Sequence, residues 1–297
     1  MRMSKESFRV FRDVLNRHTG NILSDDKEYL VRSRLAPLAT QLGLPDLDAL
    51  AARMHGPASN EAVGGLIDRM TTHETSFFRD VAPFERLAST ILPELLPRLG
   101  MDRTLRIWSA ACSTGQEPYS LAITLSSFFR SHPGYRYEIT ATDVSQQSIE
   151  LAKRGIYTDF EARRGIGETD LQRYMEPHGD GSWRVRNEIR QHIAFRTDNL
   201  LSPAVPANRF DIIFCRNVLI YFDRDAKRQI LERLPRYFRN NDGYLVLGAA
   251  ESTLGITDLY QRPAGLAFGV FTLAQPGTAA STAGPATPSR MPLASGG

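Results

Sequence analysis

The residues most suited to chemistry in this chain lie in short polar segments that follow apolar runs. The first such segment is IWSAACSTGQEPYS at 107–120, in which an apolar strand leads into a turn of small residues and then into a helix. Small side chains let a ligand approach the backbone, and the first amides of a helix have no partner within it. The second segment is EITATD at 138–143, a strand that ends in an acid. Doubly wound folds place the group that binds ribose hydroxyls there, so the pair predicts half of a site for a nucleoside-type cofactor.

Both segments also have plainer interpretations. A turn of small residues joins strand to helix in many α/β proteins that bind nothing there, and Asp143 could simply favour the N-terminus of a helix at 145–154. No glycine and lysine follow in a GxxxxGK[ST] pattern, which argues against a triphosphate, and the absence of GxGxxG disfavours a dinucleotide. The order and spacing of the two segments favour a cofactor site.

Two further segments are rich in candidate functional residues: MTTHETSFFRD at 70–80 and FDIIFCRNVLIYF at 210–222. The second is a buried strand that emerges into a polar turn. Ligands of doubly wound sheets lie outside the carboxyl ends of the strands, so Arg216, Asn217 and Tyr221 should face the same crevice as Asp143. Asn199 and Leu200 follow a strand ending near 197 and should lie on that edge too. For Asn199, a role in a turn is favoured.

The elements that must position these residues can be read from hydrophobic periodicity. Residues 5–91 follow a helical pattern, and strands alternate with helices from about 104 to 273, which indicates a mainly parallel sheet. The expected elements are 104–111, 117–131, 138–143, 145–154, 210–215, 224–238 and 243–249. Residues 156–197 interrupt the alternation and are expected to form an inserted small sheet, with strand-like pieces at 183–186 and 192–196. Residues 274–297 lack aromatic side chains and are expected to be a disordered tail.

Composition excludes several classes of function. The 297 residues are 42% hydrophobic, enough for a large core, and 36 basic residues nearly balance 33 acidic ones. We find no basic run that would bind nucleic acid and no apolar stretch near the roughly 20 residues that span a bilayer. The protein is therefore expected to be cytoplasmic, without membrane insertion. Cys112 and Cys215 are too few for a disulfide framework or a metal site.

The segments SAACSTGQEPYS, ATDVS and CRNVLIYF, in this order behind a helical region ending in TSFFRD, resemble the CheR family of chemotaxis protein-glutamate methyltransferases. The resemblance covers about residues 5–273. It implies an α/β fold: a Rossmann-like S-adenosylmethionine-dependent methyltransferase domain with an inserted small antiparallel β-subdomain, preceded by an all-α N-terminal domain. The expected domains are 1–90 and 91–273, with 156–197 as the insertion. The resemblance further implies methyl transfer from S-adenosylmethionine to glutamate side chains in the cytoplasmic domain of chemoreceptors, leaving S-adenosylhomocysteine, in receptor adaptation.

The resemblance also assigns site residues. Arg79 and Tyr221 match the active-site pair of the family. The cofactor contacts of the family match His73, Thr75, Arg79, Glu117, Asp143, Asn199, Leu200, Arg216 and Asn217. His73 departs from the usual pattern, because the family commonly has asparagine there. A neutral imidazole could still offer one donor or acceptor, and a merely packed histidine is an equal alternative.

This chemistry needs neither a catalytic triad nor a metal. A sulfonium methyl group is already activated, and a glutamate with a pKa near 4.3 is already a nucleophile at neutral pH. The enzyme must align oxygen, methyl carbon and sulfur. Arg79 is therefore expected to hold a carboxylate in a two-pronged hydrogen bond, and the Tyr221 hydroxyl to direct one oxygen. The plainer alternatives are an ion pair of Arg79 with Asp80 or Glu74, and a buried packing role for Tyr221.

Recognition of the partner is less evident in the sequence. Basic residues at 27, 32 and 34 could meet an acidic helical bundle, or could simply be a solvated face. The short loop at 176–182 favours an enzyme that does not bind a receptor C-terminal pentapeptide, and a monomer is expected. One rival keeps the cofactor but acts on a nucleobase or a small molecule. Base methyltransferases that act on exocyclic amines often carry Asn/Asp-Pro-Pro-aromatic where this chain has Arg216-Asn217-Val218-Leu219, which argues against this rival. The other rival is a cofactor-binding sensor or scaffold without catalysis.

Overall fold

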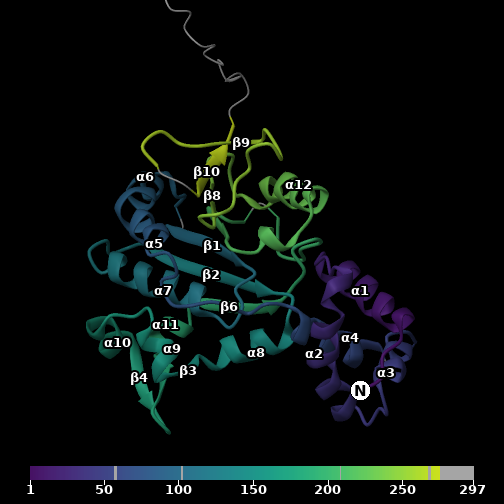
Figure 1. The fold of residues 1–297 in the computed structure, drawn as a ribbon. Helices are drawn as coiled ribbons and strands as arrows, with labels where there is room; N and C mark the ends of the chain where they lie inside the picture. Colours follow the sequence, from purple (N-terminus) through teal and green to yellow (C-terminus); the bar gives the residue numbers. More distant parts are fainter. Residues whose placement is uncertain (57–58, 102, 208, 267–268, 275–297) are drawn as a thin grey trace, which may run out of the picture.

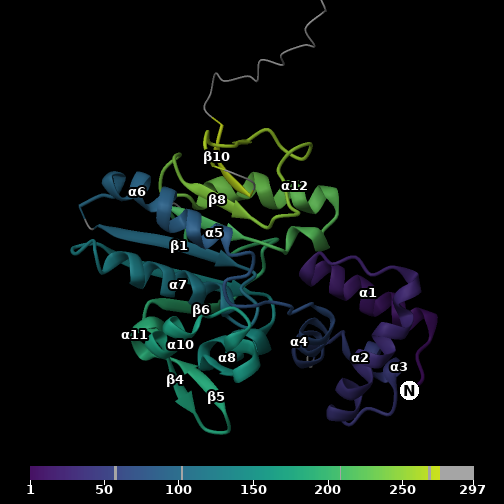
Figure 2. The same ribbon diagram turned by 60° about the vertical axis from the view of Figure 1, so that its left-hand side comes forward.

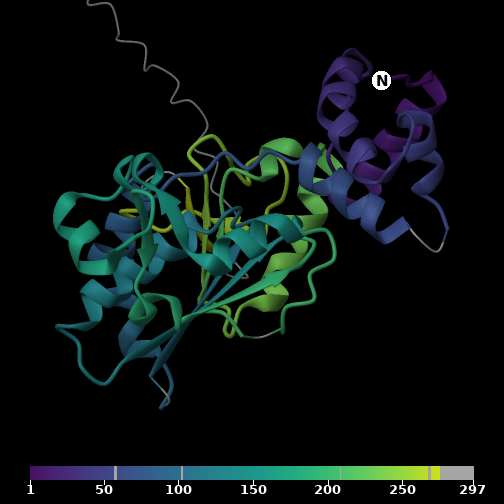
Figure 3. The same cartoon turned by 90° about the horizontal axis from the view of Figure 1, so that it is seen from below.

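The computed structural model describes residues 1–56, 59–101, 103–207, 209–266 and 269–274. Residues 275–297 of the expected tail lie outside this range. Two bodies are visible, a helical domain built from the N-terminal residues and a larger α/β body, and Figure 3 shows the helical domain projecting from one side. In the described part of the chain, no helix combines the length and apolar character needed to cross a bilayer.

The helical domain contains α1 (Lys5–Thr19), α2 (Glu28–Gln41), α3 (Leu47–Arg53) and α4 (Ser59–Met70). Ser4 caps α1 by accepting a hydrogen bond from the Ser7 amide, and Gly20 ends the helix in the left-handed conformation. Helical spacing in α1 turns Phe8, Phe11 and Leu15 to one side, where they meet the buried faces of the other three helices. This core contains no residue of the sheet, so the domain packs around itself.

The α/β body is built on a sheet with the strand order β6-β2-β1-β7-β8-β10-β9. Its members are β1 (Thr104–Ala110), β2 (Arg136–Asp143), β6 (Ile193–Thr197), β7 (Ile212–Cys215), β8 (Tyr244–Leu247), β9 (Tyr260–Gln261) and β10 (Val270–Leu273). The first five strands in the order run parallel. At one edge β10 pairs antiparallel with β8, and β9 pairs antiparallel with β10. The expected mainly parallel sheet is thus confirmed.

Helices cover both faces of this sheet. Alternate residues of β1 enter different cores: Ile107 packs beneath α7 (Gln116–Phe129), whereas Trp108 packs beneath α12 (Arg224–Arg233). Helix α8 (Gln146–Arg154) follows β2, and the 3-10 turns Leu219–Tyr221 and Leu234–Tyr237 flank α12. Figure 1 shows these layers, with the carboxyl ends of β1 and β2 directed toward the helical domain.

The helices after residue 81 pack with the sheet and not with the helical domain. They comprise α5 (Ala82–Arg86), a π-helical turn Leu87–Ile91, α6 (Leu92–Leu95) and a 3-10 turn Leu96–Arg98. Phe84, Leu87 and Ile91 are buried in the same core as Ile107. The boundary expected at residue 90 therefore cuts through one packing unit. A run of apolar residues at helical spacing does not reveal which core the helix joins.

The insertion forms a three-stranded antiparallel sheet in the order β3-β5-β4. Its strands are β3 (Ile156–Thr158), β4 (Met175–His178) and β5 (Ser182–Val185), accompanied by α9 (Asp159–Arg163), α10 (Glu168–Tyr174) and α11 (Asn187–Arg190). Figure 2 shows the β4–β5 hairpin projecting from the body. The expectation that 192–196 belongs to this small sheet is wrong. Residues 193–197 pair with β2 in the large sheet, where Ile193 and Phe195 pack on its core.

Candidate active site

The turn between β1 and α7 is held by the acid at the end of β2. The Ser113 amide donates to Asp143 Oδ2 at 2.8 Å, and the Ser145 amide donates to Oδ1 at 2.9 Å. Ala111 and Ser113 adopt positive φ values of 58° and 51°, which side-chain-bearing residues rarely do. Asp143 therefore fixes a strained turn. It also binds the amide of Ser145, the N-cap of α8, so the expectation that it favours the start of this helix is confirmed. Each carboxylate oxygen keeps a lone pair.

Gly115, also in this turn, lets α8 and β3 pack closely against the backbone. It has a φ of 99°, and a Cβ there would lie 2.8 Å from the Ala152 Cβ and 3.0 Å from the Tyr157 hydroxyl. The Tyr157 hydroxyl donates to the Thr114 carbonyl at 2.8 Å, which ties the turn to β3. Close approach at this glycine is thus made by α8 and β3. The small residues Ala111, Cys112 and Ser113 instead line the cavity described below.

Burial governs the protonation of Asp143, which is only 7% exposed. Loss of solvent raises the pKa of Asp143 above its ordinary value of 3.8, while the amides of Ser145 and Ser113 act in the opposite direction. The charges of His73 and Asp68 act on the same group, the first lowering and the second raising its pKa.

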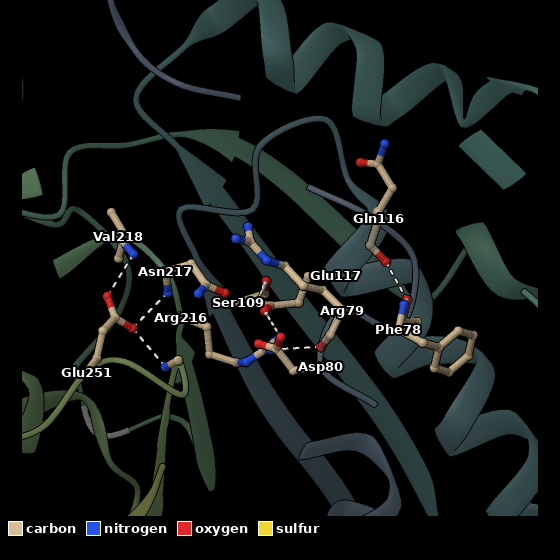
Figure 4. A network of polar contacts seen from close by, with 12 residues as sticks. Phe78, Arg79, Asp80, Ser109, Gln116, Glu117, Arg216, Asn217, Val218 and Glu251 are labelled. Carbon is tan, nitrogen blue, oxygen red and sulfur yellow. Dashed lines mark hydrogen bonds and ion pairs between the residues drawn. The ribbon is translucent and has the colours of Figure 1, made fainter. Parts of the chain in front are cut away.

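The end of β7 supplies a buried arginine at the centre of an ion-pair network. Arg216 Nη1 lies 2.9 Å from Glu117 Oε2, and Nη2 lies 2.9 Å from Asp80 Oδ2. Nη2 also donates to the Arg79 carbonyl at 2.8 Å, and the Ser109 hydroxyl donates to Glu117 Oε1 at 2.8 Å. Figure 4 shows the guanidinium between these partners. The Arg216 side chain, 1% exposed, therefore joins three distant segments beneath the site.

The segment 74–81 lies over α7 in an irregular conformation. The Phe78 amide donates to Ser120 Oγ at 2.9 Å, and Ser120 in turn donates to the Gln116 carbonyl at 2.7 Å (Figure 4). Phe78 and Asp80 have positive φ values of 48° and 66°. These contacts and the Arg216 bonds to residues 79 and 80 hold the backbone in a shape that an isolated chain would not choose.

Arg79 itself is held loosely. Its Nη1 donates to the Glu74 carbonyl at 2.9 Å. The ion pairs expected as the plainer alternative are not observed, because Asp80 pairs with Arg216 and Glu74 pairs with Arg164 at 3.0 Å. Tyr221 is 39% exposed, so a buried packing role is not observed either. Neither side chain is buried, and both line the cavity described below.

His73 is bonded within the protein through both ring nitrogens. Nε2 lies 3.0 Å from Thr71 Oγ1 and 3.0 Å from the Asp68 carbonyl, and Nδ1 lies 2.9 Å from Ser148 Oγ. The ring thereby connects α4 to α8. The backbone carbonyl of His73 accepts a hydrogen bond from the Ser113 hydroxyl at 3.1 Å, which connects this residue to the turn after β1.

Asn199 joins the two bodies in a similar way. Its Oδ1 accepts from the Leu201 amide at 2.9 Å, as expected for a turn residue, and its Nδ2 donates to the His18 carbonyl at 2.7 Å. The end of α1 is thereby brought against the carboxyl edge of the sheet.

A cavity open to solvent lies between the helical domain and this edge, and the space within its outline, open solvent included, is about 970 Å³. Small-molecule sites occur preferentially at such interfaces between domains. All ten residues expected at the site line it: His73, Thr75, Arg79, Glu117, Asp143, Asn199, Leu200, Arg216, Asn217 and Tyr221. Thr19 and Asn21 also line it and were not expected there, because no pattern in α1 indicates that its end reaches the sheet.

Asp80, Ser109 and Glu251 were not expected at the site. Their side chains bind Arg216, Glu117 and the Asn217 amide, respectively, and so fix residues that line the cavity. Glu251 could have been found, because it follows β8 at the edge where the strand ends converge. Among the described residues there is no group of three or more ligating side chains suited to a metal ion. Cys112 and Cys215 are free and buried, and burial raises the pKa of both thiols well above 9.0.

Comparison with known proteins identifies the family. Residues 73–264 match the model of the CheR methyltransferase SAM-binding domain, and residues 6–71 match the model of the CheR all-alpha domain. The chain belongs to the CheR family. It is 42% identical over 259 residues to chemotaxis protein methyltransferase Cher2 of Pseudomonas putida, covering 86% of this chain and 92% of that protein. It is 42% identical over 268 residues to chemotaxis protein methyltransferase 1 of Pseudomonas aeruginosa, covering 88% and 95%.

Membership of the CheR family confirms the fold class and the catalytic class that were expected from the sequence. The protein is an enzyme, a chemotaxis protein methyltransferase that uses S-adenosylmethionine. Among solved structures, the DszA carbon methyltransferase overlaps with a TM-score of 0.36 at 18% identity, covering 81% of this chain and 47% of that one. The two CheR models meet at residues 71 and 73, close to where the packing of the two cores divides the chain.

Proposed function

We propose that the protein methylates the γ-carboxylates of specific glutamates in the cytoplasmic domain of methyl-accepting chemotaxis receptors. The products are glutamate methyl esters and S-adenosylhomocysteine, and the reaction sets chemosensory adaptation. The observation that carries the proposal is the placement of Arg79 and Tyr221 on one cavity with Asp143, without an ion-pair partner for Arg79 among the described residues. A guanidinium and a phenol suit a carboxylate substrate.

The residues around the cavity fit S-adenosylmethionine. Asp143 offers oxygens with lone pairs to ribose hydroxyls, and the turn at Ala111–Ser113 lets a ligand approach the backbone. Asn199, Leu200 and Asn217 line the rest of the cofactor site. His73 and Arg216 are expected to contribute through the walls that they hold in place, because both ring nitrogens of His73 and both terminal nitrogens of Arg216 are bonded to protein.

Catalysis by these residues is a matter of alignment. When bound, S-adenosylmethionine supplies an electrophilic methyl group. The substrate glutamate is ionised at neutral pH, so no side chain needs to remove a proton. Arg79 binds and orients the substrate carboxylate through paired N–H donors, and the Tyr221 hydroxyl donates to one oxygen, which leaves the other oxygen directed toward the methyl group.

The experiment is transfer of a radiolabelled methyl group to a cytoplasmic receptor fragment. Arg79→Ala should reduce transfer by about 100-fold, the cost typical of losing one charge-orienting donor, with S-adenosylhomocysteine binding retained within a few fold. Arg130→Ala, an exposed arginine at the end of α7, is the matched control and should keep full activity. A fragment with its candidate glutamates changed to alanine should take up no label.

Two other outcomes decide between the alternatives. Cofactor binding without transfer to any receptor fragment would favour a sensor or scaffold. Label that persists on the alanine fragment would contradict glutamate as the acceptor.

We propose that recognition of the receptor does not rest on Arg32 and Arg34 of α2. Arg32 donates to Glu28 and to the Met3 carbonyl, and Arg34 donates to the Arg69 carbonyl. Both guanidinium groups are therefore engaged in holding the helical domain together. We propose that the enzyme acts as a cytoplasmic monomer on the receptor.

The small sheet supports a further part of the proposal, that no C-terminal pentapeptide of the receptor is bound. The sheet has two edge strands, β3 of three residues and β4 of four, and β4 includes Pro177, which lacks an N–H for pairing with an added strand. Calorimetry with a receptor pentapeptide should show no heat of binding. A saturable isotherm would contradict this.

A further inference from the structure

Glu251 has the largest number of backbone hydrogen bonds of the acidic residues around the site. Its Oε2 accepts from the amides of Asn217 and Gly248, each at 2.7 Å. Its Oε1 accepts from the amides of Val218 at 2.9 Å and Leu219 at 2.7 Å. The residue is 7% exposed, so these bonds replace nearly all of the solvent that an ionised carboxylate requires (Figure 4).

The amides bound by Glu251 belong to the segment that carries two site residues. Asn217 lies directly after the buried Arg216 and has a φ of 56°, a conformation that costs energy in a residue other than glycine. Leu219 begins the 3-10 turn Leu219–Tyr221, which ends in the residue proposed to orient the substrate. Successive amides at 217, 218 and 219 converge on one carboxylate, which fixes the direction in which the chain leaves β7.

The chain opposite this segment is shaped to admit the carboxylate. Gly248 follows β8, and a Cβ there would lie 2.7 Å from Glu251 Oε2 and 2.8 Å from Asn217 Nδ2. No side chain can occupy this position without displacing Glu251 or Asn217. Two strand ends, β7 and β8, are therefore joined through one buried acid.

We propose that Glu251 is a positioning residue for methyl transfer. It holds the turn 217–221 so that Asn217 lines the cofactor cavity and the Tyr221 hydroxyl faces the substrate carboxylate. The inference rests on the proposed function for the role of Tyr221, whereas the placement of Asn217 bears on cofactor binding alone. A carboxylate is required because four amides need four acceptor sites, and a neutral amide side chain would turn an N–H₂ group toward two of the N–H donors.

The test compares Glu251→Gln with Gly248→Ala, which disturb the same contact from opposite sides. Each should lower kcat/KM for receptor methylation by about 100-fold, because displacement of an orienting group by about 1 Å costs that much. Each variant should also bind S-adenosylhomocysteine about 10-fold more weakly than the wild type, as measured by calorimetry on folded protein. The matched control is Asp48→Asn in the helical domain, whose carboxylate accepts from the Ser4 amide at 2.7 Å, and it should leave both quantities unchanged.

A double-mutant cycle separates positioning from simple destabilisation. Tyr221→Phe alone should lower kcat by about 10-fold, and in the Glu251→Gln background it should lower kcat by less than about threefold, because the hydroxyl is already misplaced. If Glu251 only stabilised the fold, the Tyr221→Phe factor would be the same in both backgrounds. Equal factors, or unchanged kcat/KM in Gly248→Ala, would overturn the proposal.

The binding measurement also separates failure of this inference from failure of the proposed function. A wild-type enzyme that binds S-adenosylhomocysteine but labels no receptor glutamate would refute the proposed function. In that case Glu251 is judged on binding alone: 10-fold weaker affinity in Glu251→Gln and Gly248→Ala supports its positioning role, and unchanged affinity in both refutes it.

Discussion

We predict that the buried carboxylate of Asp143 makes cofactor binding sensitive to pH. Its pKa is raised by burial, so the folded protein holds a proton on Asp143 at pH values where the unfolded chain has lost it. The contribution of this group to the free energy of unfolding therefore falls as pH rises from 3.8 through the raised pKa. Ionised Asp143 is the better acceptor for ribose hydroxyls, so affinity should change in the opposite direction and rise with pH across the same window.

The measurement for this prediction is S-adenosylhomocysteine affinity by calorimetry, followed from neutral pH downward. Wild-type affinity should decline at a higher pH than an ordinary aspartate would produce. Asp143→Asn should bind more weakly and lose this step. An identical pH profile in both proteins would show that another group is responsible.

The two arginines and the tyrosine at the site have different surroundings. Arg216 is buried among Glu117, Asp80 and the Arg79 carbonyl, so it organises the site, whereas Arg79 and Tyr221 remain available to a substrate. Buried ion pairs are costly to break from one side, because the remaining charge is left without a partner. The residues that organise the site are thus distinct from those that we propose to orient the substrate.

At the scale of elements, the turn between β1 and α7 depends on packing against α8. Gly115→Ala should reduce the free energy of unfolding by about 2–5 kcal/mol, the sum of the left-handed backbone strain and the overlap with Ala152 and Tyr157. Gly43→Ala is a matched control, because Gly43 has a φ of 69° and nothing within 4 Å of the added Cβ. It should lose only about 1–2 kcal/mol.

Urea unfolding measures both glycine variants, and calorimetry with S-adenosylhomocysteine should show weaker binding for Gly115→Ala only. Equal loss of stability in the two variants would mean that the contact with α8 contributes little.

At the scale of the whole molecule, one wall of the cavity depends on the docking of the helical domain against the sheet, because Thr19 and Asn21 line it. Asp68 of α4 accepts from the Ser145 hydroxyl at 2.6 Å and from the Gln147 amide at 3.3 Å, and His73 adds its bond to Ser148. On the other side, a Cβ at Gly20 would lie 2.5 Å from the Phe222 ring. These contacts are few and mostly polar, so they can be weakened without unfolding either body.

Asp68→Ala should therefore weaken S-adenosylhomocysteine binding by several fold while the free energy of unfolding changes little. Asp46→Ala, which removes the N-cap of α3 within the same domain, should do the reverse: a loss of about 1 kcal/mol in stability with affinity unchanged. Thermal unfolding and calorimetry on the two variants make the comparison. Loss of affinity in both would indicate that the helical domain acts through its own stability and not through its docking.

The local pattern of this sequence predicted much of the structure. Strands expected at 104–111, 138–143 and 243–249 are observed at 104–110, 136–143 and 244–247, because short apolar runs bounded by turn residues are typical of buried strands. Residues at strand ends were expected to converge, and those residues do line one cavity. The helix expected at 224–238 ends at 233 and continues as a 3-10 turn, a boundary that periodicity does not define.

The sequence alone thus determined the class of the sheet, the edge at which the site lies and the residue types gathered there, because these follow from periodicity and chain direction. Only the tertiary structure decided what each of those residues does. The partners of Arg216 and Glu251 lie far from them in sequence, or on backbone amides that carry no residue signature. The same reason explains why residues 82–90 and the strand at 193–197 were assigned to the wrong neighbours, since which core an apolar face joins is settled by packing between distant segments.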